Sequence, residues 1–170
     1  MTQLLSVLHD VGLNLDKNIQ TDVIYLDFAK AFDSVDHNIL LAKLTAHGIS
    51  GNLLSWLTNY LSDRFQRVVL EGASSQWAPV TSGVPQGSLL GPLMFVIFIN
   101  DLPDAANGEV NTALYADDSK IFGAVKCVHD CEVMQTTLSN MDEWTRYNNI
   151  QFNTSKCKVL TVTRKKQPVH

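Results

Sequence analysis

Three aspartates stand at positions where a carboxylate needs a chemical reason. Asp117 and Asp118 lie side by side in YADDSK, at a predicted bend between two short strands, and Asp27 ends the apolar strand predicted over DVIYLDF. An unpaired carboxylate at the end of a buried strand is costly or stays protonated. If the bend lies beside the Asp27 strand in one sheet, the three carboxylates converge on one point.

Converging carboxylates without histidine or thiol ligands select a hard, oxygen-loving ion such as magnesium. Two such ions about 4 Å apart activate a hydroxyl and stabilise a leaving pyrophosphate oxygen in phosphoryl transfer. The residues alone leave another interpretation open, in which Asp117 and Asp118 form a solvated turn and Asp27 caps a neighbouring element. A metal-dependent nuclease or phosphatase would also use an acidic cluster.

The segment GVPQGSLLGP is a second candidate site. Gly83 and Gly87 permit close backbone approach to a flat partner, and Gln86 offers both a donor and an acceptor. The alternative is an ordinary turn into a helix whose N-terminus is capped by Ser88.

The elements that must position these residues are a mixture of helices and strands. Hydrophobic spacing and capping signals predict helices over residues 4–11, 37–47, 51–62, 88–103 and 129–148, the first ended by Gly12 and the second capped by Asp36. The last helix is expected to turn four residues inward: Val133, Leu138, Met141 and Trp144. Strands are predicted over residues 22–28, 65–72, 75–83 and 157–163, with two more between 110 and 124. The pattern predicts an α+β fold with helices on one face of a mostly antiparallel sheet.

Composition narrows the functional classes. A length of 170 residues with 45% hydrophobic side chains suits one folded domain. The formal net charge of −4 argues against a free-standing basic module that holds nucleic acid by charge alone. The longest apolar run, residues 93–99, is far shorter than the roughly 20 residues of a membrane span, so a soluble protein without membrane contact is expected.

The three cysteines predict reduced thiols in an intracellular protein, because their number is odd and the N-terminus has no signal-peptide pattern. Cys127, His129 and Cys131 could suggest zinc, but no second ligand pair stands at a matching spacing. Buried or half-buried thiols are the better interpretation of these two cysteines and of Cys157.

Four segments in order, LDFAKAFDSVDH, GVPQGSLLGPLMFVIFINDLP, YADD and NTSKCKVL, resemble motifs A, B, C and D of reverse transcriptases. The wording is that of LINE-type, non-LTR retrotransposons of the jockey-like kind, with DRFQRVVLEG between motifs A and B. The resemblance covers nearly the whole chain. It implies a ferredoxin-like polymerase palm that extends a DNA primer with dNTPs on an RNA template. It also implies two Mg²⁺ ions, with Mn²⁺ as a substitute, and a nuclear location.

The resemblance further implies roles for single residues. Asp27 and Asp117 would be the main metal ligands, with Asp118 as their neighbour, and Phe28 would contribute a backbone carbonyl. Phe32 would be the aromatic gate that rejects a 2′-hydroxyl; the alternative is an ordinary core phenylalanine.

In the remaining motifs, Gln86 and Gly87 would line the nucleotide and template site. Gly83 would belong to the primer and template surface, and Tyr115 would lie near the primer end. Lys156 would donate a proton to the departing pyrophosphate, the alternative being a solvated lysine at the start of a strand. Asp33 and Asp36, which also belong to motif A, are assigned to helix initiation and capping.

The sequence also departs from the family pattern. It begins too late to include the fingers segment, whose basic residues hold the triphosphate, and it lacks the thumb that follows motif D. We therefore expect residues 1–170 to be a partial reverse transcriptase domain, a retroelement fragment whose basic grip on nucleic acid lies elsewhere. The competing hypothesis is a catalytically inactive relic that at most binds RNA or protein.

Overall fold

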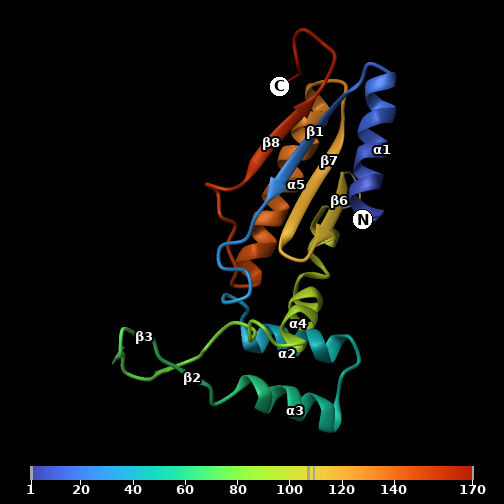
Figure 1. Ribbon diagram of the computed structural model, residues 1–170. Helices are drawn as coiled ribbons and strands as arrows, with labels where there is room; N and C mark the ends of the chain where they lie inside the picture. Colours follow the sequence, from blue (N-terminus) through green and yellow to red (C-terminus); the bar gives the residue numbers. More distant parts are fainter. Residues whose placement is uncertain (1, 107, 109, 170) are drawn as a thin grey trace. The chain divides into compact units, whose positions relative to one another are not determined.

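The computed structural model describes residues 2–106, 108 and 110–169, which fall into two compact units. Unit 1 is built from residues up to 29, 101–147 and 151 onward, and unit 2 from residues 30–100 and 148–150. Figure 1 shows the elements of both.

Unit 1 contains a four-stranded antiparallel sheet in the order β6-β7-β1-β8. Its strands are β1 (Gln20–Leu26), β6 (Asn111–Tyr115), β7 (Asp118–Val125) and β8 (Lys158–Val162). The β6–β7 hairpin lies directly beside β1, with Leu26 opposite Ser119. The sheet therefore places the segment that carries Asp27 beside the hairpin that carries Asp117 and Asp118.

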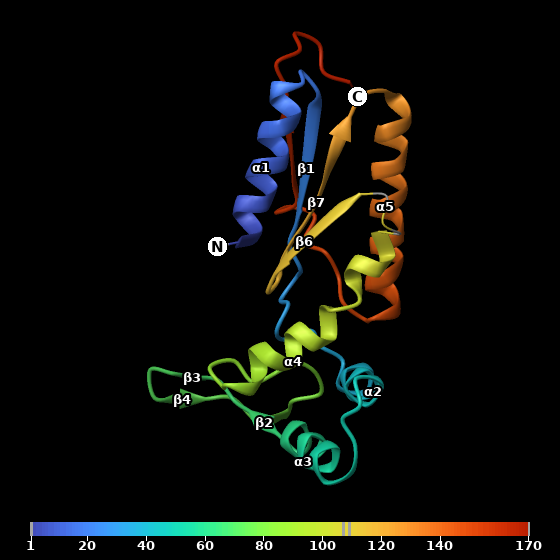
Figure 2. The same ribbon diagram turned by 90° about the vertical axis from the view of Figure 1, so that its right-hand side faces the viewer.

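Helices cover both faces of this sheet: α1 (Thr2–Asp16) lies on one side and α5 (Val128–Tyr147) on the other (Figure 2). Val7 of α1 belongs to a buried cluster with Val23 and Phe122. Ile24 and Ile121 alternate to the opposite face, where they are also buried. The mixed helix and antiparallel sheet class is confirmed, but the expected placement of helices on one face is not, because β1 is apolar on both faces and needs cover on both.

Two details of the helices in unit 1 differ from the sequence-based prediction. Helix α1 continues through Gly12 to Asp16, so that glycine does not end it. In α5, Met141 is buried as predicted, but the rest of its buried face consists of Met134, Thr137 and Thr145. Both threonine hydroxyls donate to carbonyls of their own helix, which satisfies them in the core. A short 3₁₀ helix, η1 (Leu102–Ala106), packs against α5.

Unit 2 contains three helices and a hairpin. The helices are α2 (His37–Ala46), α3 (Gly51–Leu61) and α4 (Leu90–Ile99), with α2 packed against both of the others. Their largest fully buried side chains are Leu40, Leu44, Leu61, Met94, Phe95 and Phe98. None of the helices in the described part of the chain is both long enough and apolar enough to cross a bilayer.

The hairpin of unit 2 consists of four short strands, β2 (Phe65–Gln66), β3 (Val69–Leu70), β4 (Ala73–Ser74) and β5 (Ala78–Pro79). Strand β2 pairs with β5, and β3 pairs with β4. Glu71 and Gly72 turn the chain with φ angles of 49° and 83°, as a two-residue hairpin turn requires. The predicted hairpin is therefore confirmed, and residues 62–79 are all exposed.

Candidate active site

Asp27 lies directly after β1, in a partly enclosed position. Its backbone carbonyl accepts a hydrogen bond from Asn153 N at 2.7 Å. Its Oδ2 atom is buried, accepts no hydrogen bond from the described residues, and lies 3.3 Å from the Lys156 ammonium nitrogen in an ion pair. The carboxylate thus has a cation beside it and an enclosed oxygen without a hydrogen-bond donor.

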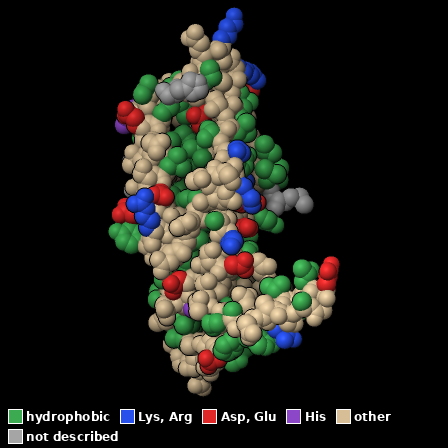
Figure 3. All heavy atoms as spheres, turned by 90° about the vertical axis from the view of Figure 1, so that its left-hand side faces the viewer, with side chains coloured by type: hydrophobic (Ala, Val, Ile, Leu, Met, Phe, Trp, Pro, Cys, Tyr) green, Lys and Arg blue, Asp and Glu red, His purple; other side chains and the backbone are tan. Residues whose placement is uncertain are grey.

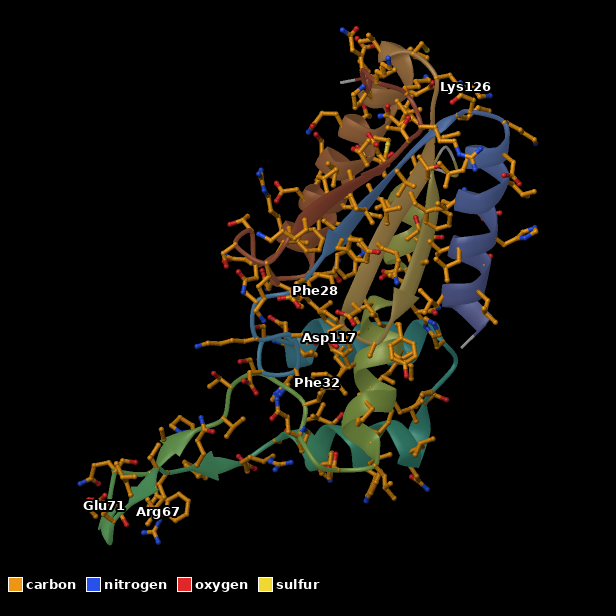
Figure 4. The ribbon with its side chains drawn as sticks, turned by 45° about the horizontal axis from the view of Figure 1, so that its top comes forward. Phe28, Phe32, Arg67, Glu71, Asp117 and Lys126 are labelled. Carbon is orange, nitrogen blue, oxygen red and sulfur yellow. The ribbon has the colours of Figure 1, made fainter. Side chains whose placement is uncertain are left out.

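Asp117 and Asp118 lie where the β6–β7 hairpin turns. Ala116 has a φ of 53°, and Tyr115 pairs with Asp118 across the turn. Because Leu26 pairs with Ser119, Asp27 and Asp118 each lie one residue beyond that pair, at the same end of the sheet. Figure 4 shows Asp117 at this end. The structure therefore brings the segments carrying the three aspartates together, as predicted.

Carboxylate oxygens are the donors that magnesium prefers, and the buried Oδ2 of Asp27 is available to a cation. Within the part of the chain that the structure describes, however, no group of three His, Cys, Asp or Glu side chains is close enough to hold a metal ion. The carboxylate donors therefore fit a hard ion by their chemistry. In the structure, the positive charge beside Asp27 is the Lys156 ammonium group.

Phe28 is held by an aromatic cluster. Its ring is 3% exposed, stacks on Phe152 with centroids 4.8 Å apart, and lies 6.4 Å from Trp144. The bridge between Phe28 and Phe152 is flanked by two backbone hydrogen bonds, from Asn153 N to Asp27 O and from Ala29 N to Gln151 O. In an antiparallel pair of this kind, the Phe28 carbonyl is directed away from the Phe152 segment. The Phe28 carbonyl, which was predicted to be a metal ligand, therefore accepts no hydrogen bond in this pairing.

Trp144 was predicted to face inward and is half-buried, whereas no supporting role was predicted for Phe152 or Asn153. Trp144 donates its indole N–H to Asp101 Oδ1 at 3.2 Å, which ties α5 to the segment before η1. The only available signal was an aromatic residue in the short stretch NIQFN after the long helix.

Phe32 belongs to unit 2, where its half-buried ring stacks on the fully buried ring of Phe95 with centroids 4.6 Å apart. Val84 N donates to Phe32 O at 2.7 Å, so the GVPQG loop is hydrogen-bonded to the turn that carries this ring. Both interpretations of Phe32 have support: one face packs in the core, and part of the side chain stays accessible.

The two glycines of the GVPQG loop are needed for different reasons. Gly83 has a φ of 89°, and a Cβ there would lie 2.8 Å from Asp33 Cα and 2.9 Å from Phe32 O. Gly83 therefore approaches the backbone of Phe32 and Asp33, which belong to its own unit. Gly87 has a φ of 78° with open space around it, so only its conformation requires glycine. Gln86 is exposed.

Asp36 has the capping role expected of it, whereas Ser88 lies one residue before the N-cap position of α4, which is Leu89. Ser88 Oγ accepts from Gly91 N at 2.9 Å in the first turn of α4. Asp36 caps α2 by accepting from the N–H groups of Asn38 and Ile39. The Asn149 side chain, together with these two N–H groups, holds the pKa of the Asp36 carboxyl below its usual range.

A cleft of about 890 Å³ lies in unit 2 between the base of the hairpin and the GVPQG loop. Its lining includes Lys30, Asp33, Arg64, Phe65, Gly83 and Gln86. Gln86 and Gly83 were predicted site residues, whereas Arg64 and Phe65 were not. Their signal was the alternation of arginine and aromatic residues in YLSDRFQR.

The cysteines form no metal site in the described residues. All three are free; Cys131 and Cys157 are half-buried as predicted, whereas Cys127 is exposed. Burial, with the nearby negative charges of Asp22 and Asp130, raises the pKa of the Cys131 thiol, which disfavours the thiolate that binds metals.

Comparison with protein families gives one domain match: the family described as reverse transcriptase (RNA-dependent DNA polymerase) matches residues 5–170. The RNA-directed DNA polymerase from mobile element jockey of Drosophila funebris is 33% identical over 156 residues, covering 88% of this chain and 17% of the relative. The probable RNA-directed DNA polymerase from transposon X-element of Drosophila melanogaster is 31% identical over 169 residues, covering 97% and 18%. The chain thus spans less than a fifth of the length of these relatives.

Two solved structures of telomerase from Candida tropicalis share the fold. One, in complex with the TWJ fragment of telomeric RNA, has a TM-score of 0.70 at 14% identity and covers 94% of this chain and 29% of that chain. The other, an apo form truncated from the C-terminal domain, has a TM-score of 0.68 at 15% identity and covers 98% and 36%.

Proposed function

The chain belongs to the reverse transcriptase family, and from that premise we propose that it is the palm of an RNA-directed DNA polymerase. The reaction would transfer a nucleotide from a dNTP to the 3′-hydroxyl of a DNA primer on an RNA template. One observation carries this proposal: the hairpin with Asp117 and Asp118 lies beside β1, which is directly followed by Asp27, and the enclosed Oδ2 of Asp27 accepts no hydrogen bond from the described residues.

Asp27, Asp117 and Asp118, with the Phe28 carbonyl, are the groups that would hold two Mg²⁺ ions, for which Mn²⁺ could substitute. When bound, such ions favour ionisation of the attacking hydroxyl and neutralise charge on the leaving pyrophosphate. The aromatic cluster around Phe28 supports this role, because it fixes the backbone from which Asp27 projects. In this proposal, the chain would hold these carboxylates in fixed positions.

The residues of unit 2 would select and orient the nucleotide. The Phe32 ring packs against the buried ring of Phe95 and would form a rigid surface that excludes a 2′-hydroxyl. The exposed amide of Gln86 would hydrogen-bond the nucleotide, and Gly87 would leave room for the template beside it. Gly83 would set the course of this loop for the same surface.

Two further residues of unit 1 would act on the primer and on the leaving group. Tyr115, 69% exposed beside the aspartate turn, would contact the primer end. The Lys156 side chain is 66% exposed, so its pairing with Asp27 is screened by water and is worth about 1 kcal/mol or less. The lysine can therefore leave Asp27 and donate a proton to the pyrophosphate.

The test is RNA-templated primer extension by a chimaera in which this chain replaces the matching segment of the jockey polymerase. Asp117→Asn should abolish extension, because an amide is a poor ligand for a hard cation. Asp104→Asn, an exposed aspartate in η1, is the matched control and should extend normally. Extension by the Asp117→Asn chimaera would overturn the assignment.

The alternative function, a relic that binds only RNA or protein, is favoured by one observation: the described residues contain no cluster of three metal-ligating side chains. A chimaera that folds and binds a primed template, but extends no primer, would establish this alternative.

A further inference from the structure

Unit 2 carries aromatic and arginine side chains on α3 and on the hairpin that follows it, which we together call the stacking platform: Trp56, Tyr60, Arg64, Arg67 and Trp77. Trp56 and Tyr60 lie one turn apart on α3, with ring centroids 5.8 Å apart and planes inclined by 20°. The Arg64 guanidinium lies 5.6 Å from the centre of the Tyr60 ring. Across the hairpin, the Arg67 guanidinium lies 4.8 Å from the Trp77 ring.

The platform is exposed, although large aromatic rings are usually covered. Trp56 is 52% exposed and Trp77 is 60% exposed, and Phe65 next to Arg64 is 60% exposed. Figure 3 shows hydrophobic and basic side chains along the projecting hairpin, and Figure 4 places Arg67 on its first arm. Trp56 and Trp77 are left uncovered by the described residues, yet each is held by a neighbouring ring or guanidinium, so both are prepared for a flat ligand.

The pairing of rings with guanidinium groups indicates the chemistry of that ligand. Exposed indole and phenol faces stack on bases, and arginines contribute both stacking and phosphate contacts. A duplex presents few unstacked bases, so the ligand should be single-stranded. The base of the same hairpin, through Arg64 and Phe65, lines the cleft that also contains Gln86, which makes the platform continuous with the proposed nucleotide site.

We propose that the stacking platform binds an unpaired stretch of nucleic acid, namely the RNA template next to the position being copied. This inference rests on the proposed function. Two of the four arginines in the sequence lie within this platform, although the whole chain has a net charge of −4. Affinity should therefore come chiefly from stacking. With two phosphates neutralised, the slope of log affinity against log salt should be about −1.4.

A protein partner would use a different part of the hairpin. Val68, Val69 and Leu70, at the far end of its first arm, are 59–70% exposed and carry no charge. They lie outside the platform, so substitutions there separate the two kinds of partner.

The test uses the full 170-residue chain and a fluorescently labelled 12-nucleotide RNA, with binding followed by anisotropy. Trp77→Ala and Trp56→Ala should each weaken binding roughly five- to hundredfold, as expected for loss of one stacked base. Trp77→Phe should restore most of it. Arg67→Gln should reduce the salt slope by about 0.7. Circular dichroism and thermal unfolding should show that these variants remain folded.

The matched controls are Arg146→Gln and Tyr147→Ala, both on exposed positions of α5 in unit 1. They should bind RNA like the unchanged protein, as should Val69→Ser near the hairpin tip, which removes apolar surface without adding charge. DNA of the same sequence should bind equally or more weakly, and a duplex at least tenfold more weakly. Duplex binding as tight as single-strand binding would contradict the proposal, and so would unchanged RNA binding by Trp77→Ala and Trp56→Ala. If those variants instead lose only self-association, the surface is a protein interface and the proposal is wrong.

RNA binding is measured in this assay without primer or dNTP, and primer extension is measured separately. Failure of the platform therefore leaves the polymerase assignment standing, and failure of the polymerase assignment shows only in primer extension.

Discussion

The aspartates of motif A differ in the groups that neutralise their charge or donate hydrogen bonds to their oxygens. Asp27 has an enclosed oxygen and a lysine 3.3 Å away, whereas Asp36 has three hydrogen-bond donors and is already satisfied. Both belong to motif A of the sequence, yet only Asp27 is left with an oxygen that a cation could take. The structure therefore confirms Asp36 as a helix cap, whereas metal binding by Asp27 stays a prediction.

The Lys156–Asp27 pair gives the first prediction at this scale. Removing the competing ammonium by Lys156→Gln should increase the affinity of the isolated chain for Mn²⁺ by up to about fivefold, in line with an ion pair of 1 kcal/mol or less. The binding can be followed by electron paramagnetic resonance of the free ion. Lys156→Arg keeps the charge and should leave the affinity near its starting value. An unchanged affinity in Lys156→Gln would show that the pair does not compete with the cation.

Asp36 gives a prediction about pH. Its folded-state pKa is lowered by Asn149 and by the N–H groups of α2, so its contribution to stability is fully present above the unfolded pKa of about 3.9 and is lost as pH falls through the lower folded value. Asp36→Ala should reduce the free energy of unfolding at pH 7 by about 1 kcal/mol, the usual worth of a cap.

Urea denaturation at pH 7 and pH 3 measures this effect. The deficit of Asp36→Ala should shrink at the lower pH, while Asp33→Asn, an exposed neighbour, should lose little at either pH. A deficit that grows on acidification would contradict the assigned direction of the pKa shift.

At the scale of elements, the strands that carry the aspartates could be predicted from sequence, because apolar runs interrupted by YADDSK leave few other arrangements. The end of α1 could not be predicted from Gly12, because a helix can tolerate a glycine in its interior, and α1 continues through Gly12 to Asp16. The buried face of α5 was also only partly predicted: its threonines bond to their own helix, which a hydrophobic pattern does not reveal. Likewise, the approach of Gly83 to the Phe32 turn depends on tertiary contact.

The contrast between Gly83 and Gly87 is testable. Gly87→Ala should cost about 1 kcal/mol of unfolding free energy, because it forces a positive φ on alanine in open space. Gly83→Ala should cost clearly more, because its Cβ would also lie less than 3 Å from backbone atoms. Chemical denaturation of the two variants measures both values. Equal losses would show that the neighbouring turn yields to the methyl group without cost.

At the scale of the whole molecule, the residues with proposed roles fall into two units. Unit 1 supplies the aspartates, and unit 2 supplies Phe32, the GVPQG loop and the stacking platform. The acidic balance of the chain is compatible with nucleic-acid contact because that contact is assigned to one local surface. The jockey and X-element relatives are much longer proteins, of which this chain covers 17% and 18%.

The sheet of unit 1 has a further consequence for how the isolated chain behaves in solution. Strand β8 lies at the end of the strand order β6-β7-β1-β8, and its Val159 and Leu160 are 65% and 49% exposed. Its outer row of peptide groups is a template to which an extended segment of another molecule can add. We therefore expect concentrated samples of the isolated chain to associate by intermolecular strand addition at β8.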